Sequence, residues 1–313
     1  MTTHATALGL DDFVSLTDCT GDDLLRILAL AQWIKRSPSE HARDLAGRSV
    51  ILLFEKPSLR TRVAFEVGVQ RLGGHAIYFD HSGRRIGERE SIHDYAKNLE
   101  RMVDAIVART FSHETIVELA GHSRVPVVNA LSDLEHPCQA LADMLTLREH
   151  LGHLEGVTLA YVGDGNNVCH ALALACAMLG VHLRIITPRS REAREDIIEL
   201  ARRRCCGSSI SVSNDPGDVR GCDAVYTDTW ASMGDESDEH SRLDRFKPYQ
   251  VNDRLMAIAG ADALFMHCLP AHRGHEVTGE VIDGPCSIVF DQAENRVHTQ
   301  CALLSVLLNR DRP

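Results

Sequence analysis

The sequence has little of what marks a secreted, membrane-spanning or disulfide-rich protein. Its ten cysteines form no C-x-x-C pair and, apart from Cys205 and Cys206, are scattered through apolar segments, which indicates thiols in a reducing compartment. The longest apolar run, residues 171–181, falls well short of the ~20 residues that a membrane span needs. Residues 1–13 have neither a basic region nor a long apolar core. We therefore expect no signal or transit peptide, and a cytoplasmic protein.

Positive charge is also scarce. The chain has 33 basic residues against 44 acidic ones, which gives a formal net charge of -11 at pH 7. This balance argues against non-specific binding to nucleic acids, because the phosphate backbone would be repelled. An anionic substrate would need a local basic pocket built against the field of the whole chain.

The pattern of apolar runs predicts parallel α/β architecture. The 313 residues are more than one typical core holds, so two domains are expected. Short apolar runs alternate with helical stretches, as in parallel sheets covered by helices on both faces. We predict two doubly wound parallel-sheet domains with the active site in the cleft between them. The expected strands are residues 50–54, 76–79, 105–108 and 125–128, then 157–162, 183–187, 224–227, 264–267 and 287–290.

A helical segment at residues 137–151 separates the two sets of strands, and we place the domain boundary near residue 142. Residues 293–309 also predict a helix, because their apolar side chains fall at helical spacing. The expected domains are 1–142, completed by the C-terminal helix 293–313, and 143–292. Ligands of such sheets bind at the carboxyl ends of the strands, so the chemistry is expected just after each run.

The first strand is followed by the sequence Glu-Lys-Pro-Ser-Leu-Arg-Thr-Arg at residues 55–62. Ser58 is a natural helix N-cap, and the free amides and dipole of the helix that follows favour an anion. Arg60 and Thr61 add a guanidinium and a hydroxyl. The segment predicts a phosphate site without a glycine loop, although a capped helix with two solvated arginines would have the same sequence.

Arg109 follows the third strand and His136-Pro137-Cys138-Gln139 follows the fourth. Proline suits the first turn of a helix, so His136 would lie at a helix N-terminus, where protonation is disfavoured. A neutral imidazole can donate one hydrogen bond to a carbonyl oxygen, and Gln139 can bond an amide. The alternatives are a surface salt bridge for Arg109 and a structural histidine.

The first strand of the second half leads into Gly163-Asp164-Gly165-Asn166-Asn167, which resembles the start of a dinucleotide fingerprint. Val168 occupies the third glycine position, and the next strand ends without an acidic residue for a ribose. Nicotinamide binding is therefore not expected. Asn167 remains a good polar contact for a small ligand.

Two more polar segments follow strands of the second half. Residues 228–234, Asp-Thr-Trp-Ala-Ser-Met-Gly, combine a carboxylate with a small-residue loop, which fits an amine-binding lid or an ordinary loop equally well. In His267-Cys268-Leu269-Pro270, the Leu269–Pro270 bond could be cis, and Cys268 could be a nucleophile, a ligand contact or a buried thiol. Arg296, near the start of the last helix, could return to the site of the first domain.

A zinc site is a further reading of this mixture of histidine and cysteine. Structural and catalytic zinc sites usually show paired ligands at short spacing. The pairs His136/Cys138 and His267/Cys268 fit that pattern poorly. We expect no metal and no organic cofactor.

Together, the S-x-R-T-R, H-P-C-Q and H-C-L-P motifs resemble the transcarbamoylase family, in its order and spacing, from about residue 10 to the C-terminus. Residues 228–234 carry the D-x-x-x-S-M-G signature that marks the ornithine-using members rather than the aspartate-using ones. The resemblance implies transfer of the carbamoyl group of carbamoyl phosphate to the side-chain amine of L-ornithine, giving L-citrulline and phosphate in arginine metabolism. It also implies a homotrimer or a multiple of trimers.

The resemblance assigns roles residue by residue. The phosphate of carbamoyl phosphate would be bound by Ser58, Leu59 (backbone), Arg60 and Thr61, and the carbamoyl end by Arg109, His136 and Gln139. Ornithine would be bound by Asn167, Asp228, Ser232 and Met233. Cys268 and Leu269 would complete the carbamoyl phosphate site, and Arg296 would close over it. Catalysis would rest on Arg109, His136, Asp228 and Cys268.

One segment departs from the family pattern. Where the family usually has Gln-Leu-Gly, sometimes with histidine first, this chain has Arg85-Ile86-Gly87. In the family that first side chain reaches carbamoyl phosphate from a neighbouring subunit, and we expect Arg85 to do so here. Alternatively, Arg85 points to solvent or pairs with an acidic neighbour, Glu88 or Glu90, and Arg84 or Arg89 takes the role.

Two other functions compete with ornithine carbamoylation. One is transfer to another amine, such as putrescine or N-acetylornithine, and the Ser232-Met233-Gly234 loop argues against it. The other is an inactive binding or regulatory protein that kept the fold. The intact arginines and His136 argue against that.

Overall fold

The computed structural model describes residues 9–81, 83–230 and 239–309. The chain divides into two compact units, Met1–Ala142 with Arg296–Pro313, and Asp143–Asn295. Two helices, α5 (Pro137–Leu151) and α11 (Val289–Leu308), contribute residues to both units. Among the described residues, no helix combines the length and the hydropathy needed to cross a membrane.

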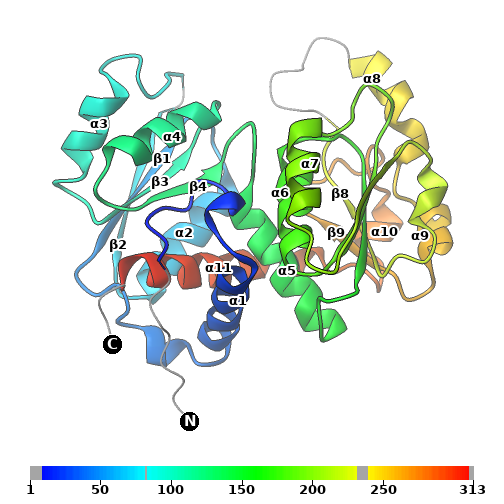
Figure 1. Cartoon of the computed structure of the whole chain (residues 1–313), viewed down its shortest axis with the longest axis horizontal. Helices are drawn as coiled ribbons and strands as arrows, with labels where there is room; N and C mark the ends of the chain where they lie inside the picture. The colour runs from blue at the N-terminus through cyan, green and yellow to red at the C-terminus, as the bar shows by residue number, and fades with distance from the viewer. Residues whose placement is uncertain (1–8, 82, 231–238, 310–313) are drawn as a thin grey trace. The chain divides into compact units, whose positions relative to one another are not determined.

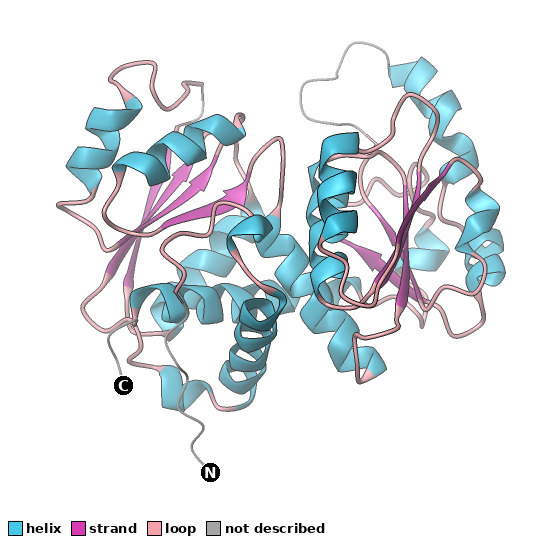
Figure 2. Cartoon of the chain, in the orientation of Figure 1, coloured by secondary structure: helices cyan, strands magenta, loops and turns pink. Residues whose placement is uncertain are grey.

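The first unit contains a four-stranded parallel sheet in the order β2-β1-β3-β4. Its strands lie between helices, as Figures 1 and 2 show. The inner strands are almost wholly buried, whereas the edge strand β2 is largely exposed. The strands are β1 (Ser49–Phe54), β2 (His75–Asp80), β3 (Ala105–Arg109) and β4 (Val127–Leu131). The helices are α1 (Gly21–Arg36), α2 (Leu59–Arg71), α3 (Ile92–Leu99) and α4 (His113–His122), with 3-10 turns at Leu16–Asp18 and Pro38–His41.

The second unit contains a five-stranded parallel sheet in the order β7-β6-β5-β8-β9. Helix α6 is buried along almost its whole length, which explains why its sequence is apolar on every side. The strands are β5 (Thr158–Val162), β6 (His182–Ile186), β7 (Ile210–Ser213), β8 (Ala224–Thr227) and β9 (Leu264–His267). The helices are α6 (Asn167–Met178), α7 (Glu195–Arg203), α8 (Glu239–Phe246), α9 (Asp253–Ala259) and α10 (Gly279–Ile282), with 3-10 turns at Pro216–Val219 and Lys247–Tyr249.

Two parallel sheets with flanking helices confirm the predicted fold class, but one predicted strand is wrong. Residues 287–290 are not a strand: Ser287 forms only an isolated bridge with Phe265, and α11 already begins at Val289. The run is apolar because Ile288 and Val289 are buried, while Phe290 is exposed, as on one face of a helix.

Strand β7 was not predicted, and strand β4 begins later in the chain than predicted. Strand β7 reads Ile-Ser-Val-Ser and lies at the sheet edge with half of it exposed, so it lacks the continuous apolar run of an inner strand. The fourth run begins at Val127 rather than at residue 125, because Pro126 has no N–H to donate to a ladder.

Candidate active site

The first group of site residues surrounds the start of α2, directly after β1. Ser58 is the N-cap: its hydroxyl accepts a hydrogen bond from the Thr61 amide at 3.3 Å and donates to Thr61 Oγ1 at 3.0 Å. The amides of Leu59 and Arg60 belong to the first turn, where no helical carbonyl can accept from them. The Leu59 side chain is 74% exposed, so only its backbone can serve such a site. The predicted cap is confirmed.

Arg296 lies beside this helix start, although it comes from α11 near the end of the chain. Its guanidinium Nη2 donates to Thr61 Oγ1 at 2.7 Å, and both residues are buried. Burying an arginine is costly unless its donors are satisfied, and the bond to Thr61 satisfies one of them. The structure thus brings a buried positive charge to the capped end of α2.

His136 lies at the start of α5, as predicted, and is buried. Burial, and then the positive charges of Arg296 and Arg109, hold the pKa of His136 well below its usual range. The imidazole is therefore neutral at physiological pH. Its Nδ1 is buried without a hydrogen-bond partner among the described residues. Gln139, one turn further along α5, is buried as well.

Arg109 ends β3, in register with Phe54 of β1, so it lies at the same sheet edge as the start of α2. Lys56 belongs to this edge too, although the sequence analysis gave it no role. Its ammonium lies 4.0 Å from the centre of the Phe111 ring. Burial, and then the charges of Arg109 and Arg85, lower the pKa of Lys56. Its position within residues 55–62, the segment that predicted the phosphate site, was the sequence signal for a role at this site.

The guanidinium of Arg85 lies 5.2 Å from the same Phe111 ring. Arg85 is exposed. In this unit, cations therefore gather around one edge of the sheet, although the chain as a whole carries a net charge of -11. That concentration of positive charge is what binding of a phosphate requires.

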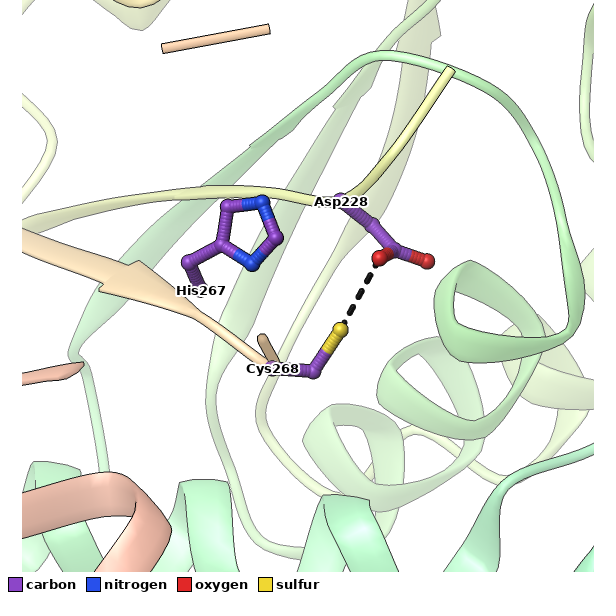
Figure 3. Close-up of side chains that lie close together, drawn as sticks. All are labelled: Asp228, His267 and Cys268. Atoms are coloured by element: carbon purple, nitrogen blue, oxygen red, sulfur yellow. Dashed lines mark hydrogen bonds between the residues drawn. The ribbon is translucent and has the colours of Figure 1, made fainter. Parts of the chain in front are cut away.

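The second group of site residues lies at the carboxyl ends of β8 and β9. Asp228 follows β8 and is buried. Its Oδ1 accepts hydrogen bonds from the Cys268 thiol at 2.9 Å and from the Thr229 amide at 2.7 Å. Figure 3 shows the thiol and the carboxylate pointing toward each other. The structure thus joins two residues that the sequence analysis named separately.

Asn166, which the sequence did not single out, contacts Asp228 directly. Its Nδ2 donates to Asp228 Oδ2 at 2.8 Å, and its Oδ1 caps α6 by accepting from the Val168 and Cys169 amides. Asn167, which the sequence analysis favoured, is the half-buried first residue of α6. The preference of asparagine for the N-cap was the signal in the sequence for Asn166, and the role of Asn167 stays a prediction.

Cys268 and Leu269 form the turn after β9. Burial and the neighbouring Asp228 carboxylate raise the pKa of the Cys268 thiol well above its usual range, so the thiol stays protonated. A nucleophilic cysteine needs the opposite environment, which leaves the contact and buried-thiol interpretations. The Leu269–Pro270 bond, whose isomer the sequence left open, is cis. Ser232 and Met233 lie outside the described residues.

The ligand atoms of Asp228, His267 and Cys268 all lie within 4.8 Å of one another. This trio could not be predicted from spacing, because Asp228 lies far from the pair His267 and Cys268 along the chain. Both ring nitrogens of His267 are engaged, Nδ1 with the Leu269 amide at 2.8 Å and Nε2 with Glu276 at 3.2 Å. A metal would have to displace one of these bonds and the thiol–carboxylate bond.

Two family models cover most of the chain. The carbamoyl-P binding domain of aspartate/ornithine carbamoyltransferase matches residues 11–149, and the Asp/Orn binding domain of the same family matches residues 155–307.

Similar proteins match this chain along nearly their whole lengths. An ornithine carbamoyltransferase from Shewanella oneidensis is 51% identical over 301 residues, 95% of this chain and 99% of that protein. One from Methanobrevibacter smithii is 50% identical over 286 residues, 90% of this chain and 95% of that protein. The solved structure of ornithine carbamoyltransferase from Pyrococcus furiosus superposes with a TM-score of 0.93 at 44% identity, covering 96% of this chain and 98% of that one.

Proposed function

The chain belongs to the aspartate/ornithine carbamoyltransferase family, and we propose that it transfers the carbamoyl group of carbamoyl phosphate to the side-chain amine of L-ornithine. The products are L-citrulline and phosphate. One observation carries the proposal within the structure: a neutral, buried His136 lies among the charges of Arg296 and Arg109, beside a capped helix start. Such an arrangement provides for both the phosphate and the carbonyl of one small substrate.

The phosphate of carbamoyl phosphate binds at the start of α2. Ser58, the Leu59 amide and Arg60 supply donors, and the helix dipole adds positive potential. Thr61 Oγ1 already accepts bonds from Ser58 and Arg296, so its own hydroxyl hydrogen is left to donate to the ligand. These donors also receive the phosphate when it leaves.

The carbamoyl end lies toward Arg109, His136 and Gln139. A neutral imidazole donates one hydrogen bond to the carbonyl oxygen without adding a third fixed charge beside the two arginines. Attack by an amine turns that oxygen into an oxyanion. Donors held in place before the reaction stabilise it best, and this is usually the largest catalytic contribution.

Ornithine binds through the second unit, with its reacting amine neutral so that it can attack. Asp228 is the main polar anchor, oriented by Asn166 and Cys268. Asn167, Ser232 and Met233 complete the binding of the amino acid. That Cys268 and Leu269 also contact carbamoyl phosphate, and that the active site lies in a cleft between the domains, remain predictions.

We assign residues 1–142 with the C-terminal helix 293–313 to carbamoyl phosphate, and residues 143–292 to ornithine. The family match for the Asp/Orn binding domain runs on to residue 307, whereas the structure groups the chain from Arg296 onward with the first unit. The bond from Arg296 to Thr61 supports the structural grouping.

The deciding experiment is a citrulline assay in which ornithine, putrescine and N-acetylornithine compete as acceptors. We expect ornithine to be used at least about 100-fold more efficiently, because a site built to pair polar groups rejects analogues that leave them unpaired. Equal use of putrescine would transfer the proposal to another amine, and no carbamoylated product with any acceptor would support an inactive relative.

We predict that the reaction needs no metal ion and no organic cofactor. The attacking group is the substrate's own amine, and the charges of Arg109 and Arg296 take the place of a Lewis acid. Full activity is expected after exhaustive chelation and dialysis. Loss of activity that zinc restores would instead assign a role to the trio of Asp228, His267 and Cys268.

We propose a cytoplasmic homotrimer or a multiple of trimers. Six of the ten cysteines are buried as thiols, as is usual in a reducing compartment. Edge strand β2 and the neighbouring α2 expose four large apolar side chains, which favours burial against another copy of the chain. They are Leu59, Val63, Ile77 and Phe79.

We predict that Arg85→Gln raises the Michaelis constant for carbamoyl phosphate and makes it less sensitive to salt. A guanidinium adds charge toward a dianion, and an amide does not. If Arg85 serves a neighbouring subunit, mixed trimers of Arg85→Gln and Arg60→Ala chains should regain sites with the unsubstituted Michaelis constant. Mixtures that regain none would place Arg85 in the site of its own chain, and an unchanged constant at both ionic strengths would leave it without a role.

A further inference from the structure

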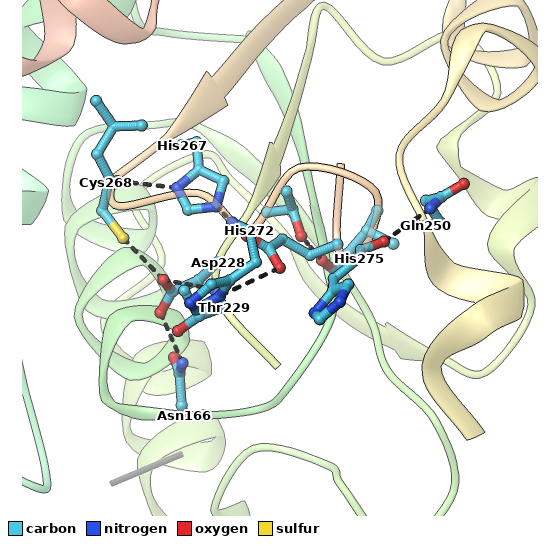
Figure 4. Close-up of polar contacts among 12 residues, drawn as sticks. Asn166, Asp228, Thr229, Gln250, His267, Cys268, His272 and His275 are labelled. Carbon is cyan, nitrogen blue, oxygen red and sulfur yellow. Dashed lines mark hydrogen bonds and ion pairs between the residues drawn. The ribbon is translucent and has the colours of Figure 1, made fainter. Parts of the chain in front are cut away.

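His267 is the last residue of β9, and its side chain is fully buried. Nδ1 accepts a hydrogen bond from the Leu269 amide at 2.8 Å, so the ring proton sits on Nε2, which donates to Glu276 Oε1 at 3.2 Å. Figure 4 shows this histidine next to the Cys268–Asp228 pair. One imidazole thus links a buried carboxylate to the backbone of the turn that follows β9.

The Leu269 backbone needs such support. Its φ of 60° lies in the left-handed region, which non-glycine residues rarely adopt and which persists only where the surroundings hold it. The acceptor for its amide comes from the His267 side chain rather than from a neighbouring strand. The shape of the turn therefore depends on the position of one ring nitrogen.

Glu276 is itself anchored to a separate part of the second unit. Its backbone carbonyl accepts from the Val251 amide at 2.8 Å, and its Oε1 also accepts from the His272 amide. The same loop is tied down by Gln250, whose Nε2 donates to the carbonyls of Gly274 and His275 at 2.9 Å each. The carboxylate is thus a fixed point for the imidazole.

The turn is held from its other side through Cys268, whose thiol donates to Asp228 Oδ1. We propose that His267 and Glu276 form a positioning pair, which holds the Cys268–Leu269 turn in the shape that ornithine use requires. The inference rests on the proposed function. Neither residue touches a substrate; both act through the turn.

The test compares two substitutions that each keep one of the two hydrogen bonds made by the His267 side chain. In His267→Asn, Oδ1 takes the place of Nδ1 and still accepts from the Leu269 amide, but the bond to Glu276 is lost. In His267→Gln, the amide nitrogen reaches the place of Nε2 and still donates to Glu276, but the Leu269 amide loses its acceptor. If the turn matters, the glutamine variant is the more damaged of the two.

We expect kcat/KM for ornithine to fall about 10- to 100-fold in His267→Gln, the effect of leaving the partly buried Leu269 amide unpaired, and several-fold less in His267→Asn. Glu276→Gln, which keeps an oxygen for the His267 proton, is expected to stay within about tenfold of the unsubstituted protein. Calorimetric affinity for carbamoyl phosphate should fall much less than ornithine kcat/KM in all three variants. The donors at the start of α2 in the first unit hold the phosphate, and the turn adds only the predicted contacts of Cys268 and Leu269.

Equal losses in the asparagine and glutamine variants, or a loss of carbamoyl phosphate affinity as large as the loss in ornithine kcat/KM, would reduce the pair to a merely structural element and overturn the inference. Unsubstituted ornithine kinetics in His267→Gln would overturn it as well. The unsubstituted protein is assayed beside the variants. If it makes no citrulline, the proposed function fails; if it makes citrulline and the variants give one of these results, only the inference about the pair fails. If the glutamine variant does not fold, Glu276→Gln and Glu276→Leu are compared instead. We expect a higher kcat/KM for ornithine in Glu276→Gln, and equal values would contradict the proposed role of the pair.

Discussion

Arg60→Ala is expected to weaken binding of carbamoyl phosphate by roughly 10- to 150-fold, because a charged hydrogen bond of about 1.5–3 kcal/mol is lost. Arg60 is the second residue of α2 and is half-buried. It lies where the first-turn amides and the helix dipole already favour an anion. Removing the guanidinium leaves the dianion with fewer donors at the place where its charge is concentrated.

Arg62→Ala is the matched control, two residues further along the same helix. Its guanidinium pairs with Glu66 at 3.0 Å and lies 3.8 Å from the centre of the Tyr78 ring. Exposed pairs of this kind contribute at most about 1 kcal/mol, so the affinity for carbamoyl phosphate should stay within severalfold. Calorimetry on both variants decides: equal losses would indicate a general field effect, and an unchanged Arg60→Ala would remove the phosphate from the start of α2.

The positions of the site segments could be predicted because parallel strands place their carboxyl ends at one sheet edge. Ser58 and Pro137 predicted two helix starts, because serine is preferred at the N-cap and proline in the first turn whatever the rest of the fold. Helix α5 has its predicted bounds for the same reason. These features are local, so the sequence alone was sufficient.

What the sequence could not supply were partners far apart along the chain. Arg296 bonds to Thr61 across 235 residues, and no spacing rule connects them. That the Asn166 side chain faces Asp228 is shown only by the folded second unit.

The errors in secondary structure have a similar origin. The run at residues 287–290 is apolar in both a strand and a buried helix start, and periodicity cannot separate these in four residues. Edge strand β7 alternates serine with apolar residues, so its signal was weak. In both cases the environment, rather than the local preference, decided the structure.

Asp228→Asn is expected to lower kcat/KM for ornithine by about 100-fold or more, while leaving the affinity for carbamoyl phosphate unchanged. The buried carboxylate accepts from three donors: the Cys268 thiol and Thr229 amide on Oδ1, and Asn166 on Oδ2. An amide has only one oxygen, so its NH₂ group must face a donor of one or the other set. A mismatch of buried donors costs about 1–3 kcal/mol, in addition to the loss of the charge that orients the substrate amine.

Asp223→Asn is the control, because Asp223 precedes the same strand and also accepts a backbone bond, from the Thr158 amide at 2.7 Å. It is exposed and lies at the opposite end of β8, so water can solvate the new amide and no substrate group is lost. Its ornithine kinetics should match those of the unsubstituted protein. If the two variants lose ornithine activity equally, the loss reflects a weakened strand rather than the carboxylate. If Asp228→Asn instead abolishes carbamoyl phosphate binding and spares ornithine, the assignment of ornithine to the second unit is wrong.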